Sequence, residues 1–481
     1  KLIYKQMILI GSFCGLLHNT MDDDDQFQQQ IATQSKIHMF KQLVDHFNNT
    51  NTDTFDQKYI VNEQHCKREN TTCPIFVHIG GESPLPDTAL DGVKYANIYF
   101  AKELGAITVA LEHRFYGVSF PSETNLTFLS SRQGQADLAR FIAFVKKEYN
   151  KPDAKVIVQG GSYPGAMAAW MRSRFPHLVD VALSSSGPVL AENDYFNYLK
   201  HIQDQFAANG CQPELQETLK FIQKEILNTP HAHKFKAAFN VTDDLDLGNL
   251  QGLDLVNVLE AVVDGLAGLI QYALAENFDG TQKPGQVAQF CKELKEAKFG
   301  DDRMWVLGKN NNLGKTTLKY SKFLEEMKSD KMKRSWYYQT CTEFGFYQTA
   351  QFDGSMFPQE INLDYFVGIC KDAFFEPMLN RQLTLAEAHQ MVQDMIDYTN
   401  AFFGARNIPR SHIYYTNGKV DPWSELGVVQ ELKWKDGQYL HKDTVVEWIE
   451  EGSHCTDMNM NWKINDALRA RQLAKIKEWL Q

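Results

Sequence analysis

Residues 154–176 read AKVIVQGGSYPGAMAAWMRSRFP, and this stretch decides the fold. Its first part, Val156 to Val158, is a short β-branched run that predicts a buried strand. Good helix formers follow from Ala166 to Phe175. A serine among glycines between a strand and a helix is typical of a nucleophile elbow, because glycine allows the sharp turn that exposes the hydroxyl. Ser162 is therefore the candidate nucleophile.

Pro164 departs from the usual G-x-S-x-G spelling, because it stands where the second glycine is expected. It lies in the first turn of the predicted helix, where an N–H has no intrahelical acceptor, so the loss of that group costs little. The N–H that an oxyanion hole needs is that of Tyr163, which remains. An ordinary glycine-rich turn with an incidental serine is the alternative interpretation of this stretch.

Composition narrows the classes of function. The chain has 481 residues, of which 43% are hydrophobic, enough for a large core in two or three domains. Its net charge is −11 and no basic stretch occurs, which argues against nucleic acid as a partner. No Cys-x-x-Cys or His-x-x-x-His spacing occurs, so we predict neither a metal site nor a cofactor.

The first residues are typical of a secretory signal peptide, predicted here over residues 1–20. Lys1 and Lys5 precede an apolar run from Met7 to Leu17. That run is too short to span a bilayer comfortably, and no later segment is long and apolar enough, so we predict no membrane span. A buried N-terminal segment is the alternative.

Cysteines and sequons support passage through the secretory pathway. Cys14 falls in the predicted signal peptide, and seven other cysteines remain. If neighbours along the chain pair, the disulfides are Cys66–Cys73, Cys211–Cys291 and Cys341–Cys370, and Cys455 is left without a partner. The connectivity cannot be deduced from the sequence. Four Asn-x-Thr sequons predict glycosylated surface loops; they begin at Asn48, Asn70, Asn125 and Asn240.

Strands and helices alternate in the first part of the chain. Short apolar runs predict strands at 75–79, 106–111, 155–158 and 179–183. Helical patterns lie at 88–103 and 137–149. This alternation predicts a mostly parallel sheet with helices on both faces.

The pattern changes near residue 190. Residues 191–400 are mostly helical in character and carry four cysteines, so we predict an inserted helical cap domain there. The strand pattern resumes at 413–416 and 444–449, and a last helix is predicted at 462–481. The chain therefore reads as an α/β-hydrolase fold in two parts, residues 36–190 and 401–481.

Two further residues complete a candidate triad in the chain order Ser, Asp, His that this fold uses. Asp421 follows the strand 413–416, and His454 follows the strand 444–449. The serine needs a base to take its proton, which histidine supplies near neutral pH, while the aspartate orients the imidazole. Asp457 is a rival acid, but it is too close to His454 in sequence to come from the expected loop.

The predicted oxyanion hole needs a second N–H besides that of Tyr163, from the loop after an early strand. The loop His78-Ile-Gly-Gly-Glu-Ser83 is in that place. Its donor is the N–H of Gly81 or of Glu82, and the sequence does not choose between them. A plain glycine turn is the alternative.

With these residues placed, the chain resembles the serine peptidase family that holds lysosomal Pro-X carboxypeptidase, dipeptidyl peptidase II and thymus-specific serine protease. The resemblance runs from Asp45-His46-Phe47 to the His454 loop, whose Gly-Ser-His-Cys-x-Asp-Met sequence is nearest the thymus-specific branch. The other shared motifs are Thr54-Phe55, Gly80-Gly81-Glu82, Glu112 to Gly117, Gly160 to Tyr163, Glu343 to Tyr347, Asn417-Gly418 and Asp421-Pro422-Trp423.

The resemblance implies a helical cap on an α/β-hydrolase and a peptide substrate, cleaved by an exopeptidase that often cuts after proline. It implies a substrate-pocket role for Trp423, whose aromatic face suits a proline ring, although core packing would explain this residue equally. It also implies a homodimer, a free thiol at Cys455, and a lysosomal, vacuolar or extracellular location. An esterase or lipase on the same fold, or a catalytically idle secreted glycoprotein, are the alternatives.

Overall fold

The computed structural model describes residues 35–66, 69–92, 95–273, 285–311, 313–314, 316–408, 411–430, 441–460 and 465–481. These residues form two compact units. The sheet unit holds the described residues up to Leu190 together with Asn400–Lys419 and Leu426–Gln481, and the helical unit holds Ala191–Thr399 with Val420–Glu425. The predicted signal peptide and Cys14 lie outside the described residues.

An eight-stranded sheet organises the sheet unit, in the order β1-β2-β4-β3-β5-β6-β9-β10 among the described strands. The pairs β1–β2 and β2–β4 are antiparallel and all the others are parallel. The strands are β1 Lys36–Leu43, β2 Thr54–Asn62, β3 Ile75–Ile79, β4 Ile107–Leu111, β5 Val156–Gly161, β6 Val181–Ser185, β9 Ile413–Gly418 and β10 Val445–Ile449.

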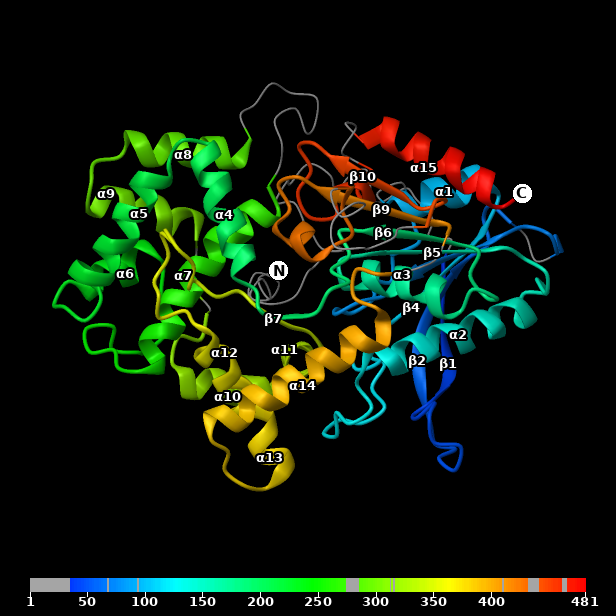
Figure 1. The fold of residues 1–481 in the computed structure, drawn as a ribbon, viewed down its shortest axis with the longest axis horizontal. Helices are drawn as coiled ribbons and strands as arrows, with labels where there is room; N and C mark the ends of the chain where they lie inside the picture. The colour runs from blue at the N-terminus through cyan, green and yellow to red at the C-terminus, as the bar shows by residue number, and fades with distance from the viewer. Residues whose placement is uncertain are drawn as a thin grey trace. The chain divides into compact units, whose positions relative to one another are not determined.

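Helices cover both faces of this sheet (Figure 1). On one face lie α1 (Ala96–Leu104) and α15 (Asp466–Trp479), and on the other lie α2 (Ser131–Glu148) and α3 (Tyr163–Arg174). The core under α1 and α15 joins Phe76, Phe100 and Ile476, which are fully buried. A mostly parallel sheet between two helical layers confirms the predicted α/β-hydrolase fold.

The central strands are continuous apolar runs because both of their faces are covered. Every residue of β4, β5 and β6 is buried. In contrast, β1 lies at the edge of the sheet, and its first four residues are exposed. Such a strand has little apolar alternation, which is why the sequence did not predict β1. The strand β2 was not predicted either, although it lies inside the sheet and is mostly buried.

Two predicted helices have different bounds in the structure. The helix predicted at 88–103 begins only at Ala96, because residues 87–92 form turns closed by the bonds Ala89 N–H to Pro86 O and Asp91 N–H to Thr88 O. The helix predicted at 137–149 starts earlier, since the Ser130 hydroxyl caps it by accepting the N–H of Gln133.

The helical unit comes between β6 and β9 in the chain and also contains two short parallel strands, β7 (Glu192–Asp194) and β8 (Gly345–Tyr347). Its α-helices are α4 Phe196–Ala208, α5 Gln212–Phe221, α6 Ala232–Ala238, α7 Leu253–Gln271, α8 Gln286–Glu296, α9 Asp301–Asn310, α10 Tyr320–Ser329, α11 Lys331–Gln339, α12 Leu363–Cys370, α13 Glu376–Leu379 and α14 Leu385–Phe403, whose last residues enter the sheet unit. None of the helices described in either unit is long and apolar enough to cross a membrane.

Three disulfides lie among the described residues, and they are the three pairs that chain order predicted: Cys66–Cys73, Cys211–Cys291 and Cys341–Cys370. Cys455 is also disulfide-bonded. The expectation of a free thiol beside His454 is therefore wrong.

Candidate active site

Ser162 lies on a strained turn between β5 and α3. Its φ and ψ are 64° and −133°, a conformation that side chains rarely adopt. The N–H of Ser162 donates to Ser185 O on the neighbouring strand β6, over 2.8 Å. Its side chain is buried, and the hydroxyl makes no hydrogen bond among the described residues. This strained strand-to-helix turn has the geometry of a nucleophile elbow.

Glycines around the elbow are required by close backbone contacts. A Cβ on Gly160 would lie 2.1 Å from the carbonyl oxygen of Pro164, and a Cβ on Gly165 would lie 2.6 Å from the oxygen of Ser185. No larger residue fits at either position without moving the turn or strand β6.

Pro164 connects the elbow to the loop after β3. A Cβ on Gly81 would lie 2.4 Å from Cγ of Pro164, so the proline ring rests directly against Gly81. Pro164 is the second residue of α3, where its missing N–H has no intrahelical role. The ring therefore sets the position of the loop that carries both candidate second oxyanion donors, Gly81 and Glu82.

His113 holds the side chain of Tyr163, the residue that follows the candidate nucleophile. Nδ1 of His113 faces the carbonyl oxygen of Arg114 at 2.7 Å, so Nδ1 carries the proton and Nε2 is the acceptor. The Tyr163 hydroxyl lies 2.9 Å from that Nε2 and donates to it. Burial lowers the pKa of His113 to about 4, which keeps this acceptor neutral. Sequence reasoning quoted His113 in a shared motif but gave it no role.

Arg114, the residue after His113, belongs to a buried cluster of charged side chains. The guanidinium of Arg114 donates to Asp137 through Nε at 2.7 Å and Nη2 at 2.6 Å, and His46 Nε2 lies 2.8 Å from the same carboxylate. Arg114 also donates to the carbonyl oxygens of Val44 and Leu43. Burial alone would raise the pKa of Asp137, but the charge and hydrogen bonds of Arg114 bring it below its usual value. This cluster fixes the loop after β4 to α2 and to the end of β1.

His454 is buried on the loop that follows β10. Three residues later, Asp457 anchors this loop to the sheet. Its carboxylate accepts from the hydroxyls of Ser185 on β6 and Thr416 on β9, the latter over 2.6 Å, and from Gln472 Nε2 on α15 over 3.3 Å. Both oxygens of Asp457 are thus committed to structural hydrogen bonds, which removes the main argument for it as the rival acid.

Gly418 lets the His454 loop lie against the end of β9. A Cβ on Gly418 would lie 2.2 Å from the carbonyl oxygen of Gly452 and 2.6 Å from that of Ser453. The glycine in the Asn417-Gly418 motif is therefore explained by this close backbone approach.

Asp421 comes three residues after β9 and belongs to the helical unit. It is fully buried, and its Oδ1 accepts the N–H of Trp423 at 3.0 Å. The Trp423 ring is buried between Tyr195 and Phe346, and its Nε1 donates to Gln271 over 3.0 Å. These contacts give Trp423 a packing role, and its predicted pocket role stays a prediction.

A cavity of about 70 Å³ opens beside the elbow. The loop from His78 to Pro86 lines it, together with Gly161 and Pro164 of the elbow. Glu82 is 4% exposed, and its Oε1 is buried without a hydrogen-bond partner in the described part of the chain. Burial raises the pKa of Glu82 to about 8, which a bond from its own N–H offsets only in part.

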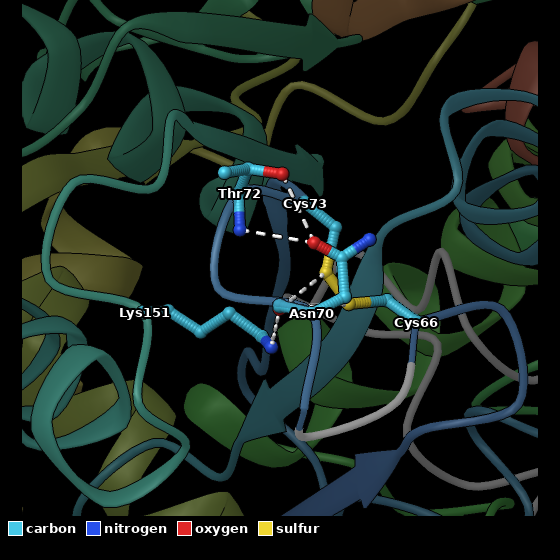
Figure 2. The surroundings of a disulfide bond; sticks show 5 residues. All are labelled: Cys66, Asn70, Thr72, Cys73 and Lys151. Carbon is cyan, nitrogen blue, oxygen red and sulfur yellow. Dashed lines mark hydrogen bonds between the residues drawn. A yellow bond between two sulfur atoms is a disulfide. The ribbon is translucent and has the colours of Figure 1, made fainter.

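The four predicted glycosylation asparagines are exposed. In three of them, at Asn48, Asn70 and Asn125, the side-chain oxygen accepts both the N–H and the hydroxyl of the sequon threonine. Figure 2 shows Asn70 inside the loop closed by the disulfide Cys66–Cys73. At Asn240 the threonine hydroxyl donates to Gly314 O instead. No cluster of side chains that could hold a metal ion occurs among the described residues.

The fold and the elbow define the class of protein: an α/β-hydrolase with a buried serine at its strand-to-helix turn. A family model described as serine carboxypeptidase S28 matches residues 42–472. The chain belongs to this family and is a serine-type peptidase.

Named relatives cover most of the chain. Thymus-specific serine protease of Mus musculus is 31% identical over 449 residues, which are 87% of this chain and 81% of that protein. The Homo sapiens protein of that name is 29% identical over 457 residues, covering 89% and 82%. Lysosomal Pro-X carboxypeptidase of Homo sapiens is 26% identical over 490 residues, covering 94% and 89%.

Proposed function

We propose that the protein is a serine exopeptidase in which Ser162 attacks the scissile carbonyl carbon. His454 takes the proton of the serine and later passes it to the leaving amine, and Asp421 orients the imidazole and stabilises its charged form. The observation that carries this proposal is the strained, buried Ser162 at the start of α3.

The order of the strands supports the choice of partners. Strands β5, β6, β9 and β10 are consecutive and parallel, so the segments after β5, β9 and β10 leave the same edge of the sheet. Ser162, Asp421 and His454 lie on those three segments. Asp421 is only three residues beyond the last residue of β9, so chain connectivity keeps it within about 10 Å of that strand end.

Two backbone N–H groups are the proposed oxyanion donors. The first is that of Tyr163, in the first turn of α3, where N–H groups have no intrahelical acceptor. For the second we favour Gly81 over Glu82, because the N–H of Glu82 is bonded to its own carboxylate. The contact of Gly81 with Pro164 supports this choice, since it ties the donor loop to the elbow.

A preference for cleavage after proline is part of the proposal, since a relative named Pro-X carboxypeptidase covers nearly the whole chain. We also propose that the protein passes through the secretory pathway to a lysosome-like or extracellular compartment and that it forms a homodimer. Sedimentation of the purified protein tests the dimer, and a monomeric profile would refute it.

Labelling with a fluorophosphonate probe tests the nucleophile. The wild type is expected to be labelled at Ser162, and Ser162→Ala is expected to lose both labelling and cleavage of proline-containing peptides. Ser173→Ala on α3 is the matched control, because Ser173 lies on the same helix and is only partly buried; it should label like the wild type. A folded wild-type protein that is not labelled would contradict the proposal, and ester turnover without peptide cleavage would assign an esterase.

A further inference from the structure

The loop that follows β3 and carries the proposed oxyanion donor Gly81 is fixed at both of its ends. At its start, the N–H of Gly80 donates to the carbonyl oxygen of the last residue of β4 over 2.9 Å. At its end, the N–H of Leu85 donates to Oε1 of Glu112 over 3.0 Å, and the carbonyl oxygen of Leu85 accepts from Nζ of Lys58 over 2.7 Å. Gly81 lies between these two attachments.

The carboxylate of Glu112 joins this loop to the loop after β4. Glu112 is 1% exposed and directly follows β4. Besides the N–H of Leu85, its carboxylate accepts the N–H of Val118 over 2.9 Å and the hydroxyl of Ser119 over 2.6 Å, both through Oε2. A Cβ on Gly117 would overlap this carboxylate, so the glycine leaves room for it. Both oxygens of Glu112 are thus engaged, and one side chain connects the loops that follow two adjacent parallel strands.

Lys58 provides the second attachment from a neighbouring strand. It is buried on β2, which pairs with β4, and its carbonyl oxygen accepts the N–H of Glu112 over 3.0 Å. Its Nζ also donates to the exposed carboxylate of Asp87 over 2.6 Å. The two side chains that hold Leu85 therefore start from β2 and from the residue directly after β4. A side chain placed by packed strands is held more precisely than one placed by a loop.

These attachments act close to the elbow. Gly81 rests against the ring of Pro164, since a Cβ on Gly81 would lie 2.4 Å from Cγ of that ring. Pro84 and Pro86 flank Leu85, and each proline ring fixes φ, so the backbone is restricted there. A shift of Leu85 is therefore passed along a short and stiff segment to Gly81.

We propose that Glu112 is a positioning residue for catalysis: by holding Leu85, it keeps the N–H of Gly81 aimed at the oxygen of the scissile carbonyl group. Lys58 assists it by holding the carbonyl side of the same residue. The inference rests on the proposed serine-peptidase function and assigns Glu112 no contact with the substrate. When Ser162 Oγ adds to the carbonyl carbon, negative charge develops on the oxygen, and a donor already in place stabilises it. A loop that is held less firmly binds the substrate as before but stabilises the transition state less, which lowers kcat rather than raising KM.

Glu112→Gln tests the attachment without removing the side chain. A glutamine has one acceptor oxygen, whereas two donors face Oε2 of Glu112 and one faces Oε1. The amide oxygen is therefore expected on the Oε2 side, which places the NH2 group against the N–H of Leu85 and releases the loop. We expect kcat on a proline-containing peptide to fall by about 10- to 100-fold, as for a misplaced oxyanion donor, while KM changes by less than about threefold.

A second variant and a matched control separate positioning from stability. Lys58→Met keeps the aliphatic stem but removes the Nζ donor, and it should lower kcat by about tenfold with KM retained. Asn62→Ala is the control, because Asn62 is also buried on β2 and its side chain donates to the carbonyl oxygen of Leu90, beyond the loop, over 2.8 Å. It should lower the melting temperature but keep the wild-type kcat per active site. Fluorophosphonate labelling taken to completion counts the active sites, and thermal denaturation reports stability.

The outcomes distinguish this inference from the proposed function. A folded Glu112→Gln protein with the wild-type kcat per labelled site would overturn it, as would a loss in kcat of the same size in Asn62→Ala. A raised KM with an unchanged kcat would also overturn it, because the loop would then bind substrate rather than aim a donor. If Glu112→Gln does not fold, Lys58→Met decides by the same criteria. In each of these cases labelling of the wild type at Ser162 shows that the serine peptidase itself stands, whereas a folded wild type without labelling would overturn both.

Discussion

Gly81→Ala is expected to impair catalysis by moving the loop that carries a proposed oxyanion donor. The added Cβ would lie 2.4 Å from Cγ and 2.9 Å from Cδ of Pro164, whereas ordinary contacts begin at 3.4 Å. The loop or the proline must therefore shift by about 1 Å, and a misplacement of that size can lower the rate about 100-fold. Overpacking also costs about 1–3 kcal/mol of stability.

Removal of the proline ring should rescue this variant. In Gly81→Ala/Pro164→Ala, the two ring carbons that clash are absent, and the remaining Cβ of residue 164 lies at an ordinary 3.9 Å. We expect kcat of the double variant to exceed that of Gly81→Ala by at least about tenfold, a coupling of about 1.4 kcal/mol between neighbouring residues.

The assay is steady-state kinetics on one proline-containing peptide, with active sites counted by fluorophosphonate labelling and folding checked by thermal denaturation. Labelling separates a smaller kcat from a smaller fraction of folded enzyme. A folded Gly81→Ala protein with the wild-type kcat would refute the reasoning. So would a folded double variant that is as impaired as Gly81→Ala alone.

Two further predictions concern His113 and the two candidate acids, Asp421 and Asp457. His113 has a pKa of about 4 in the folded protein against an ordinary 6.5, so the unfolded state binds more protons between these pH values. The free energy of unfolding therefore falls as pH drops through that window, by up to about 3 kcal/mol. His113→Gln should reduce this dependence on pH in urea titrations, and an unchanged dependence would argue against a neutral His113. Asp457→Ala leaves three donors without their acceptor and should lower the free energy of unfolding by at least about 2 kcal/mol, while the folded fraction is still labelled. In contrast, Asp421→Asn should stay folded and lose about 10⁴-fold in kcat. The reverse pattern would make Asp457 the catalytic acid.

The sequence predicted the parts of the fold that rest on local patterns. Short β-branched runs marked β3, β4 and β5 because both faces of these strands are buried, and Gly160 marked the turn. The edge strand β1 was missed since its side chains are mostly exposed. The turns at residues 87–92 resemble a helix in sequence because Ala89 and Leu90 are apolar. These two residues are apolar because they pack in a small core with Ile60 and Ala110.

The contacts that shape the site were not predictable in the same way. Pro164 was interpreted as a local helix-turn residue, whereas its ring packs on Gly81 from a distant loop. Likewise, Arg114 and His46 both bond to Asp137 only after three separate segments come together. No periodicity or spacing encodes such pairings, so they depend on the tertiary structure. The raised pKa of Glu82 is a similar case, since burial causes it.

The anchoring of Asp457 has a consequence for synthesis of the protein. Its partners Ser185 and Thr416 lie on adjacent strands, yet the segment Ala191–Thr399 of the helical unit separates them along the chain. A contact of such long sequence separation forms slowly and only after both ends have left the ribosome. On the proposed mechanism, the nascent chain displays its serine early but has no working base until the loop after β10 is made. A peptidase built in this order cannot attack its neighbours during translation.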